Sequence, residues 1–126
     1  MHHAFALMPP ESELTLAAVK DRLKITFPEA TVALKGGEIT ITEGDWDYHL
    51  VLQKGPEILE ESEGFAGRIS GLDDDSSLRA CDRRIEVWSE TPDPFMEYFE
   101  KHFQVLGVLR EFKGVILVDP SEPSLL

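Results

Sequence analysis

Apolar side chains recur at two different spacings in this chain, and the spacing changes from segment to segment. In the second quarter of the chain the repeat is every second residue, which places alternate side chains on opposite faces of a β-strand. Two such runs, Thr31–Lys35 and Glu38–Thr42, flank Gly36-Gly37, a dipeptide typical of a tight hairpin turn. The alternation resumes from Trp46 to Gln53. We therefore predict three sequential antiparallel strands.

Three other segments carry apolar residues three or four positions apart, the spacing of one face of an α-helix. The first is expected to begin at Ser12, whose hydroxyl can cap the helix, and to end before Pro28. The second opens with Pro56, because proline at the first helical position loses no hydrogen bond. The third opens with Asp93 as its cap. Its stripe is expected to face the core and consists of Phe95, Phe99, Phe103 and Leu106.

Three further apolar runs predict strands at Ala4–Met8, Arg84–Trp88 and Val115–Val118. The last run is apolar on both faces, so we expect it near the centre of the sheet. The order is then β-α-β-β-β-α-β-α-β within a single α+β domain of residues 1–126. Because the helices follow strands of a mostly antiparallel sheet, we predict a two-layer sandwich with the helices packed on one face.

The charge balance narrows the partners that this chain can bind. Of its 126 residues, 24 are Asp or Glu and 12 are Lys or Arg, which gives a formal net charge of −12. Such a surface repels phosphate, so we expect neither nucleic acid nor membrane as a partner and favour a basic protein or peptide. In size and charge the chain is similar to the small acidic immunity proteins of bacterial toxin systems, a general likeness that rests on no motif.

The same composition bears on the compartment. Cys81 is the one cysteine, so no intramolecular disulfide can form. The segment 1–10 lacks the basic start of a secretory leader, and no apolar run reaches the length of a membrane span. We therefore expect a soluble protein in the reducing cytoplasm.

Acidic residues concentrate in two parts of the chain. Residues 57–75 hold seven acids against the single base Arg68, and residues 86–100 hold five more acids with no base. If the two helices in these regions lie side by side on the sheet, their charges form one electronegative face for a basic partner. A solvated face that only keeps the protein soluble is the alternative. The residues assigned to this acidic face are Glu57, Glu60, Glu61, Glu63, Asp73, Asp74, Asp75, Glu97 and Glu100.

The sequence carries no motif of covalent or cofactor chemistry. It contains no G-x-S-x-G elbow, no phosphate-binding glycine loop and no dinucleotide fingerprint. Cys81 stands close to two arginines, but a lone cysteine that enters a strand is typical of core packing. The run 73–75 of three aspartates lacks the glycine and the distant glutamate of an EF-hand loop. We therefore predict no catalytic residue, no metal site and no cofactor.

The favoured function is that of a non-enzymatic, acidic protein-binding module, and an immunity-type protein that neutralises a basic partner is one version of it. A small enzyme or a ligand- or metal-binding domain is the first alternative. It would use a sheet-face pocket at Trp46, Asp47 and His49, where the carboxylate and the imidazole could share a proton or a metal ion. A self-associating subunit, such as a homodimer formed through an open sheet face, is the second alternative.

Overall fold

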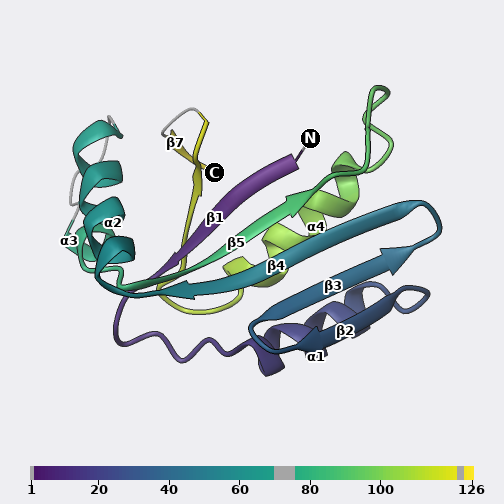
Figure 1. Ribbon diagram of the computed structural model, residues 1–126, viewed down its shortest axis with the longest axis horizontal. Helices are drawn as coiled ribbons and strands as arrows, with labels where there is room; N and C mark the ends of the chain where they lie inside the picture. Colours follow the sequence, from purple (N-terminus) through teal and green to yellow (C-terminus); the bar gives the residue numbers. More distant parts are fainter. Residues whose placement is uncertain (1, 70–75, 122–123) are drawn as a thin grey trace.

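The fold is built on one twisted sheet whose strands are joined by four helices (Figure 1). The computed structural model describes residues 2–69, 76–121 and 124–126. Its strands are β1 (His2–Met8), β2 (Thr31–Lys35), β3 (Glu38–Glu43), β4 (Trp46–Lys54), β5 (Arg83–Ser89), β6 (Ile116–Asp119) and β7 (Ser124–Leu125). Its helices are α1 (Leu16–Thr26), α2 (Pro56–Arg68), α3 (Ser76–Arg79) and α4 (Phe99–Arg110).

The sheet has the strand order β2-β3-β4-β5-β1-β6-β7, and every described pairing is antiparallel. The predicted α+β class and antiparallel sheet are therefore confirmed, and the predicted element order recurs with the short α3 and β7 added. β6 lies between β1 and the two-residue β7 and so sits nearer an edge than the centre. Its side chains are nevertheless covered on both faces, with Leu117 and Val118 buried.

The meander β2-β3-β4 follows the predicted pattern closely. The turn between β2 and β3 contains Gly36 at a φ of +61°, a left-handed conformation that glycine adopts without a steric penalty. The pairs Val32↔Ile41 and Leu34↔Ile39 place apolar side chains on one face. The period-two pattern alone therefore determines which side chains of these strands face the core.

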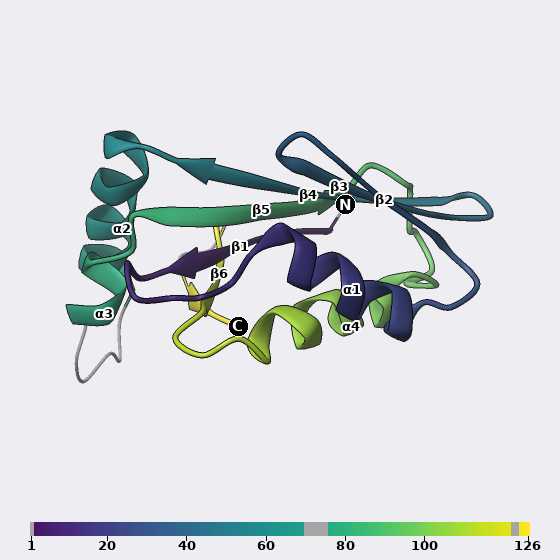
Figure 2. The same ribbon diagram turned by 90° about the horizontal axis from the view of Figure 1, so that it is seen from below.

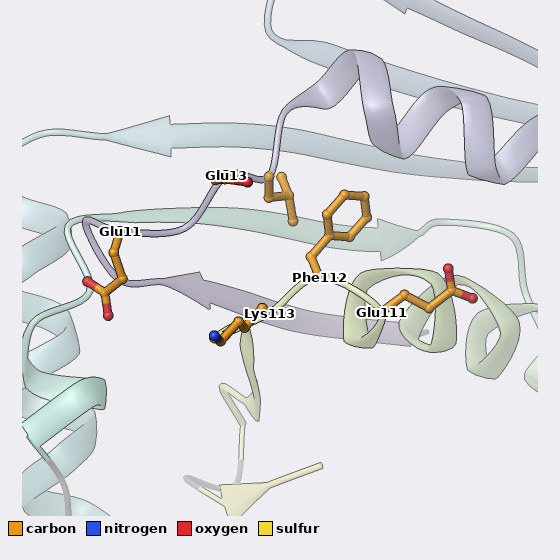
Figure 3. Close-up of a pocket in the computed structure, with 7 residues that line it drawn as sticks. Glu11, Glu13, Glu111, Phe112 and Lys113 are labelled. Atoms are coloured by element: carbon orange, nitrogen blue, oxygen red, sulfur yellow. The ribbon is translucent and has the colours of Figure 1, made fainter.

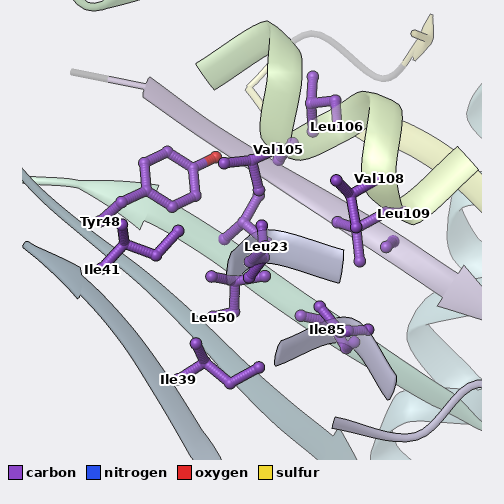
Figure 4. Close-up of a cluster of buried hydrophobic side chains, with 14 of the residues drawn as sticks. Leu23, Ile39, Ile41, Tyr48, Leu50, Ile85, Val105, Leu106, Val108 and Leu109 are labelled. Carbon is purple, nitrogen blue, oxygen red and sulfur yellow. The ribbon is translucent and has the colours of Figure 1, made fainter. Parts of the chain in front are cut away.

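Helices α1 and α4 lie side by side against one face of the sheet, which we call the inner face (Figure 2). Apolar side chains from β3, β4 and β5 meet those of the two helices in a single cluster (Figure 4). The members that Figure 4 labels include Leu23, Ile39, Ile41, Tyr48, Leu50, Ile85 and Leu109, all with an exposed fraction of 0%. This cluster is the main core of the protein.

Helices α2 and α3 pack over the opposite, outer face at one end of the sheet (Figures 1 and 2). In this detail the structure differs from the expectation that the helices share one face. The reason lies in β1, which is apolar at successive positions and so needs cover on both sides. Ala6 faces the main core, whereas Phe5 and Leu7 join a second buried cluster with Phe65 of α2 and Leu78 of α3.

Two helices begin later than the sequence predicts. The cap of α1 is Thr15, whose Oγ1 accepts a hydrogen bond from the backbone N–H of Ala18 at 3.2 Å, so Ser12 lies outside the helix. Helix α4 begins at Phe99, so Asp93 lies six residues before its first residue. Asp93 does not cap α4 because its carboxylate accepts hydrogen bonds from His2 at 2.9 Å and from the backbone N–H of Tyr98 at 3.1 Å.

The later start of α4 is accompanied by a different buried face from the one predicted. Phe95, Phe99 and Phe103 are 81%, 40% and 51% exposed, so the expected core stripe faces solvent except at Leu106. The buried residues of α4 are instead His102, Val105, Leu106, Val108 and Leu109. His102 turns inward because its imidazole shares a hydrogen bond with the buried hydroxyl of Tyr48.

Candidate functional site

The three residues of the predicted sheet-face pocket lie on two different faces of β4. Trp46 is fully buried on the inner face, where its ring lies 5.5 Å from that of Phe27 and 6.4 Å from that of Tyr98. Asp47 and His49 point to the outer face, because side chains alternate along a strand. The structure therefore brings Asp47 and His49 to one face and leaves Trp46 on the other.

His49 has its own small cluster on the outer face. Its ring stacks on Trp88 with the ring centres 5.2 Å apart, and its Nδ1 lies 3.2 Å from Oε1 of Glu38. Among the residues that the structure describes, no three His, Cys, Asp or Glu side chains are arranged to hold a metal ion. The approach to Glu38 is not a hydrogen bond, because Nδ1 of His49 has no hydrogen-bond partner among the described residues.

A chain of polar side chains crosses the same outer face from α2 to β1, and the sequence analysis did not anticipate it. Glu61 pairs with Arg84, whose Nε donates to Oε1 of Gln53 at 2.6 Å. The amide of Gln53 donates to Glu86 at 3.1 Å, and His3 donates to the same carboxylate at 2.7 Å. We call these five residues the outer polar chain. Each member donates a hydrogen bond to its neighbour or accepts one from it.

A second polar chain lies inside the fold, between β4, α4 and β1. The Tyr48 hydroxyl and Nδ1 of His102 are 2.6 Å apart, and the ring of His102 stacks on that of His2 at 4.8 Å. His2 in turn donates to Asp93 at 2.9 Å. This chain ties the first strand to the segment that precedes α4.

The pKa values along this inner chain favour a fixed, neutral arrangement at its buried end. Burial lowers the pKa of His102 to about 4, with a further lowering from the nearby His2, and burial raises the pKa of Tyr48. Burial by itself would raise the pKa of Asp93. Hydrogen bonds from His2 and from backbone N–H groups outweigh that effect, so the pKa of Asp93 falls below its ordinary value. The imidazole of His102 and the phenol of Tyr48 are thus uncharged at neutral pH.

Cys81 is the nucleophilic side chain that the sequence singled out. It is fully buried between α3 and β5, and its thiol donates to the backbone carbonyl of Ser77 at 3.2 Å. Burial, together with the nearby Asp82 and Glu11, raises the pKa of the thiol to about 12. The thiol therefore stays protonated at neutral pH and packs as an apolar group.

The predicted acidic face divides into two separate clusters. Glu57, Glu60 and Glu63 are exposed on α2, and Glu61 is held by Arg84. Glu97 and Glu100 are exposed at the start of α4. Helix α2 lies at one end of the sheet on the outer face and α4 lies under the inner face, so these charges do not merge (Figures 1 and 2). Asp73, Asp74 and Asp75 lie outside the described residues.

An exposed apolar surface accompanies the acids of the α4 cluster. It consists of Phe95, Met96, Phe99 and Phe103, which we call the aromatic patch. The rings of Phe99 and Phe103 lie 5.5 Å apart, and Met96 adopts a left-handed φ of 59° in the turn before the helix. The nearest base in sequence, Lys101, pairs with Glu43 and lies 5.0 Å from the ring of Trp46. Lys101 is thus directed towards β3 and β4 by these contacts.

A groove of about 530 Å³ lies at the other end of α4 (Figure 3). Figure 3 shows Phe112 projecting from the segment after α4 towards the segment before α1. The groove is lined by Glu11, Glu13, Leu14, Glu111, Phe112, Lys113 and Gly114. The lining combines the apolar Leu14 and Phe112 with charged side chains, of which Glu111 is already paired with Arg22.

Comparisons of the chain with protein-family models, with curated proteins and with solved structures find no match. In the part of the chain that the structure describes, no helix is both long enough and apolar enough to cross a bilayer.

Proposed function

We propose that this protein is a non-enzymatic binding module that docks a basic, amphipathic segment of another protein along α4. The observation that supports it best is the aromatic patch, which exposes three phenylalanines and a methionine beside carboxylates. The exposed carboxylates next to these residues in the sequence are those of Glu97 and Glu100. An apolar surface with a charged rim is the arrangement of a protein–protein interface.

The exposure of the aromatic patch is costly unless a partner covers it. Phe95 is 81% exposed, and Phe103 is 51% exposed although the buried His102 lies one residue before it. Burying one such ring on binding contributes about 2 kcal/mol by area alone. The adjacent rings of Phe99 and Phe103 can therefore supply the anchor of an interface.

The charges indicate the chemistry of the partner. Glu97 and Glu100 border the aromatic patch, and the groove at the far end of α4 adds Glu11 and Glu13. A net charge of −12 would also speed the approach of a basic partner at low salt. A basic toxin neutralised by this chain is one form of such a partner.

Affinity capture from native lysate at low salt tests the proposal with three variants. Phe99→Ser with Phe103→Ser removes the patch, and Glu97→Lys with Glu100→Lys reverses the adjacent charges. Glu57→Lys with Glu60→Lys is the matched control, because it makes the same charge change on the distant α2. We expect a basic protein that the wild type and the control retain and that the first two variants lose, by about tenfold or more in affinity.

Two outcomes would contradict the proposal. A basic protein lost only by the α2 control would place the interface on the other acidic cluster. Sedimentation that shows a dimer abolished by Phe99→Ser with Phe103→Ser would assign the aromatic patch to self-association instead.

A further inference from the structure

A second cleft, remote from α4, lies between α2 and the outer face of the sheet. It encloses about 270 Å³ and is lined by Phe5, Glu61, Phe65, Arg68, Arg84 and Pro120. Two of the 12 basic residues of this acidic chain thus face one small cleft. The cleft carries a formal charge of +1 from two arginines and one glutamate, opposite in sign to the protein as a whole.

Each arginine of the cleft is held against an aromatic ring. The guanidinium carbon of Arg84 lies 4.0 Å from the ring centre of Phe5, and that of Arg68 lies 5.1 Å from the ring centre of Phe65. The two rings contact each other edge to face, with centres 5.9 Å apart. The rings therefore join both cations into one prearranged unit with apolar walls.

Arg84 is the buried member of this unit. Its side chain is only 9% exposed, and its Nε donates to Oε1 of Gln53. Its Nη1 donates to the carboxylate of Glu61, a side chain that is 50% exposed. The carboxylate of Glu61 therefore already binds the guanidinium of Arg84. Because half of the Glu61 side chain is exposed, it can also turn towards solvent. Arg68 forms no ion pair with any residue that the structure describes.

The size and charge of the cleft select among anions. A cleft of about 270 Å³ lies just below the usual range for ligand pockets, so its occupant is small. A net charge of −12 opposes the approach of a dianion such as phosphate more than that of a monocarboxylate. The walls formed by Phe5 and Phe65 favour a ligand with an apolar body.

We propose that this cleft binds the carboxylate of a small apolar acid between Arg68 and Arg84, and that Glu61 competes with the ligand for Arg84. The arginines present planar donors that match a carboxylate, and the two phenylalanine rings contact the apolar part of the ligand. The competition by Glu61 would keep the affinity of the wild type modest.

The test is a titration of the protein with phenylacetate at constant ionic strength. Binding is monitored through the NMR signals of the arginine Nε–H groups. We expect saturable shifts at Arg68 and Arg84. Glu61→Gln removes the competing charge and should tighten binding by about tenfold, whereas Arg68→Gln should weaken it by about tenfold. Glu60→Gln is the matched control, because Glu60 is an exposed neighbour on the same helix. The affinity of this variant for phenylacetate should stay within about twofold of that of the wild type.

Acetate and inorganic phosphate serve as comparison ligands. Both should bind more weakly than phenylacetate, acetate because it lacks the apolar body and phosphate because it carries more charge. Equal binding of all three ligands would overturn the assignment to an apolar acid. Unchanged affinity in Glu61→Gln, with a fold shown intact by circular dichroism, would overturn the competitive role of Glu61.

Discussion

The two faces of the sheet are made by alternate residues of the same strands, yet they differ in almost every physical property. On the inner face Ile39, Ile41 and Leu50 have no exposed surface and contact only apolar neighbours and aromatic rings. On the outer face the polar chain from Glu61 to His3 includes side chains that are partly exposed to solvent. The comparison shows that the inner face is closed by apolar packing alone along these strands, whereas the outer face combines a second apolar cluster under α2 and α3 with a chain of polar side chains.

The energetic reasons for this difference follow from burial. Each fully buried aliphatic side chain of the inner face contributes about 2 to 3 kcal/mol by removal from water. Exposed ion pairs contribute about 0 to 1 kcal/mol, because water already solvates both partners. The exposed members of the outer polar chain, such as Glu86 and His3, should therefore contribute little to the stability of the fold.

The largest expected effect comes from replacing, one at a time, two neighbouring residues of β4 whose side chains point to opposite faces. Leu50→Ala should lower the free energy of unfolding by about 3 kcal/mol, because it opens a cavity in the cluster of Figure 4. Val51→Ala, one residue later on the partly exposed outer face, should lower it by about 1 kcal/mol or less. Urea unfolding of both variants measures the difference. Equal losses would show that the two faces carry the stability jointly.

A smaller effect is expected from acid, and it also belongs to the inner face. Burial lowers the pKa of His102 to about 4 in the folded protein, whereas an unfolded chain has a histidine pKa of about 6.5. The unfolded chain therefore binds more protons between these values, and stability that is complete above pH 6.5 falls as the pH drops towards 4. Allowing for screening, we expect the contribution of His102 to be about 2 kcal/mol.

His102→Gln tests this acid effect, because glutamine keeps a hydrogen-bonding group near Tyr48 and does not titrate. Urea unfolding at pH 7, 6 and 5 should show a flatter pH dependence in the variant than in the wild type. The carboxyl of Asp93, whose pKa lies below its usual range, stays ionised over this interval and so adds nothing to the difference. Equal slopes in the two proteins would show that His102 does not titrate as its burial implies.

The sequence predicted the strands more accurately than the helices, and the reason is the period of each pattern. A repeat of two allows only two faces, so the hairpin at Gly36-Gly37 and the inward residues of β4 follow directly from the pattern. A helix can carry several overlapping stripes of apolar residues, and for the region of α4 the stripe predicted to face the core was the wrong one. Asp93 satisfies the rules for a helix cap locally, but His2, 91 positions away, occupies its carboxylate.

The candidate sites were predicted less well, because they depend on contacts between distant segments. Phe99 and Phe103 were assigned to the core because aromatic residues at helical spacing usually pack there. Trp46 and His49 were grouped into one pocket although the alternation of β4 already separated them. The continuous apolar run of β1 was the available sign that both faces of the sheet are covered. Arg84 and Gln53 become recognisable as partners only once the register of β4 and β5 is known.

The smallest expected effect lies in the middle of the outer polar chain. Glu86→Gln keeps the shape of the side chain but removes the charge that accepts hydrogen bonds from His3 and Gln53. Because Glu86 and His3 are 27% and 41% exposed, water can replace the lost contacts, and we expect a loss of about 0.5 kcal/mol. A double-mutant cycle with His3→Ala measures the coupling between the two. A loss as large as that of Leu50→Ala would mean that the polar chain of the outer face stabilises the fold as strongly as the apolar packing of the inner face.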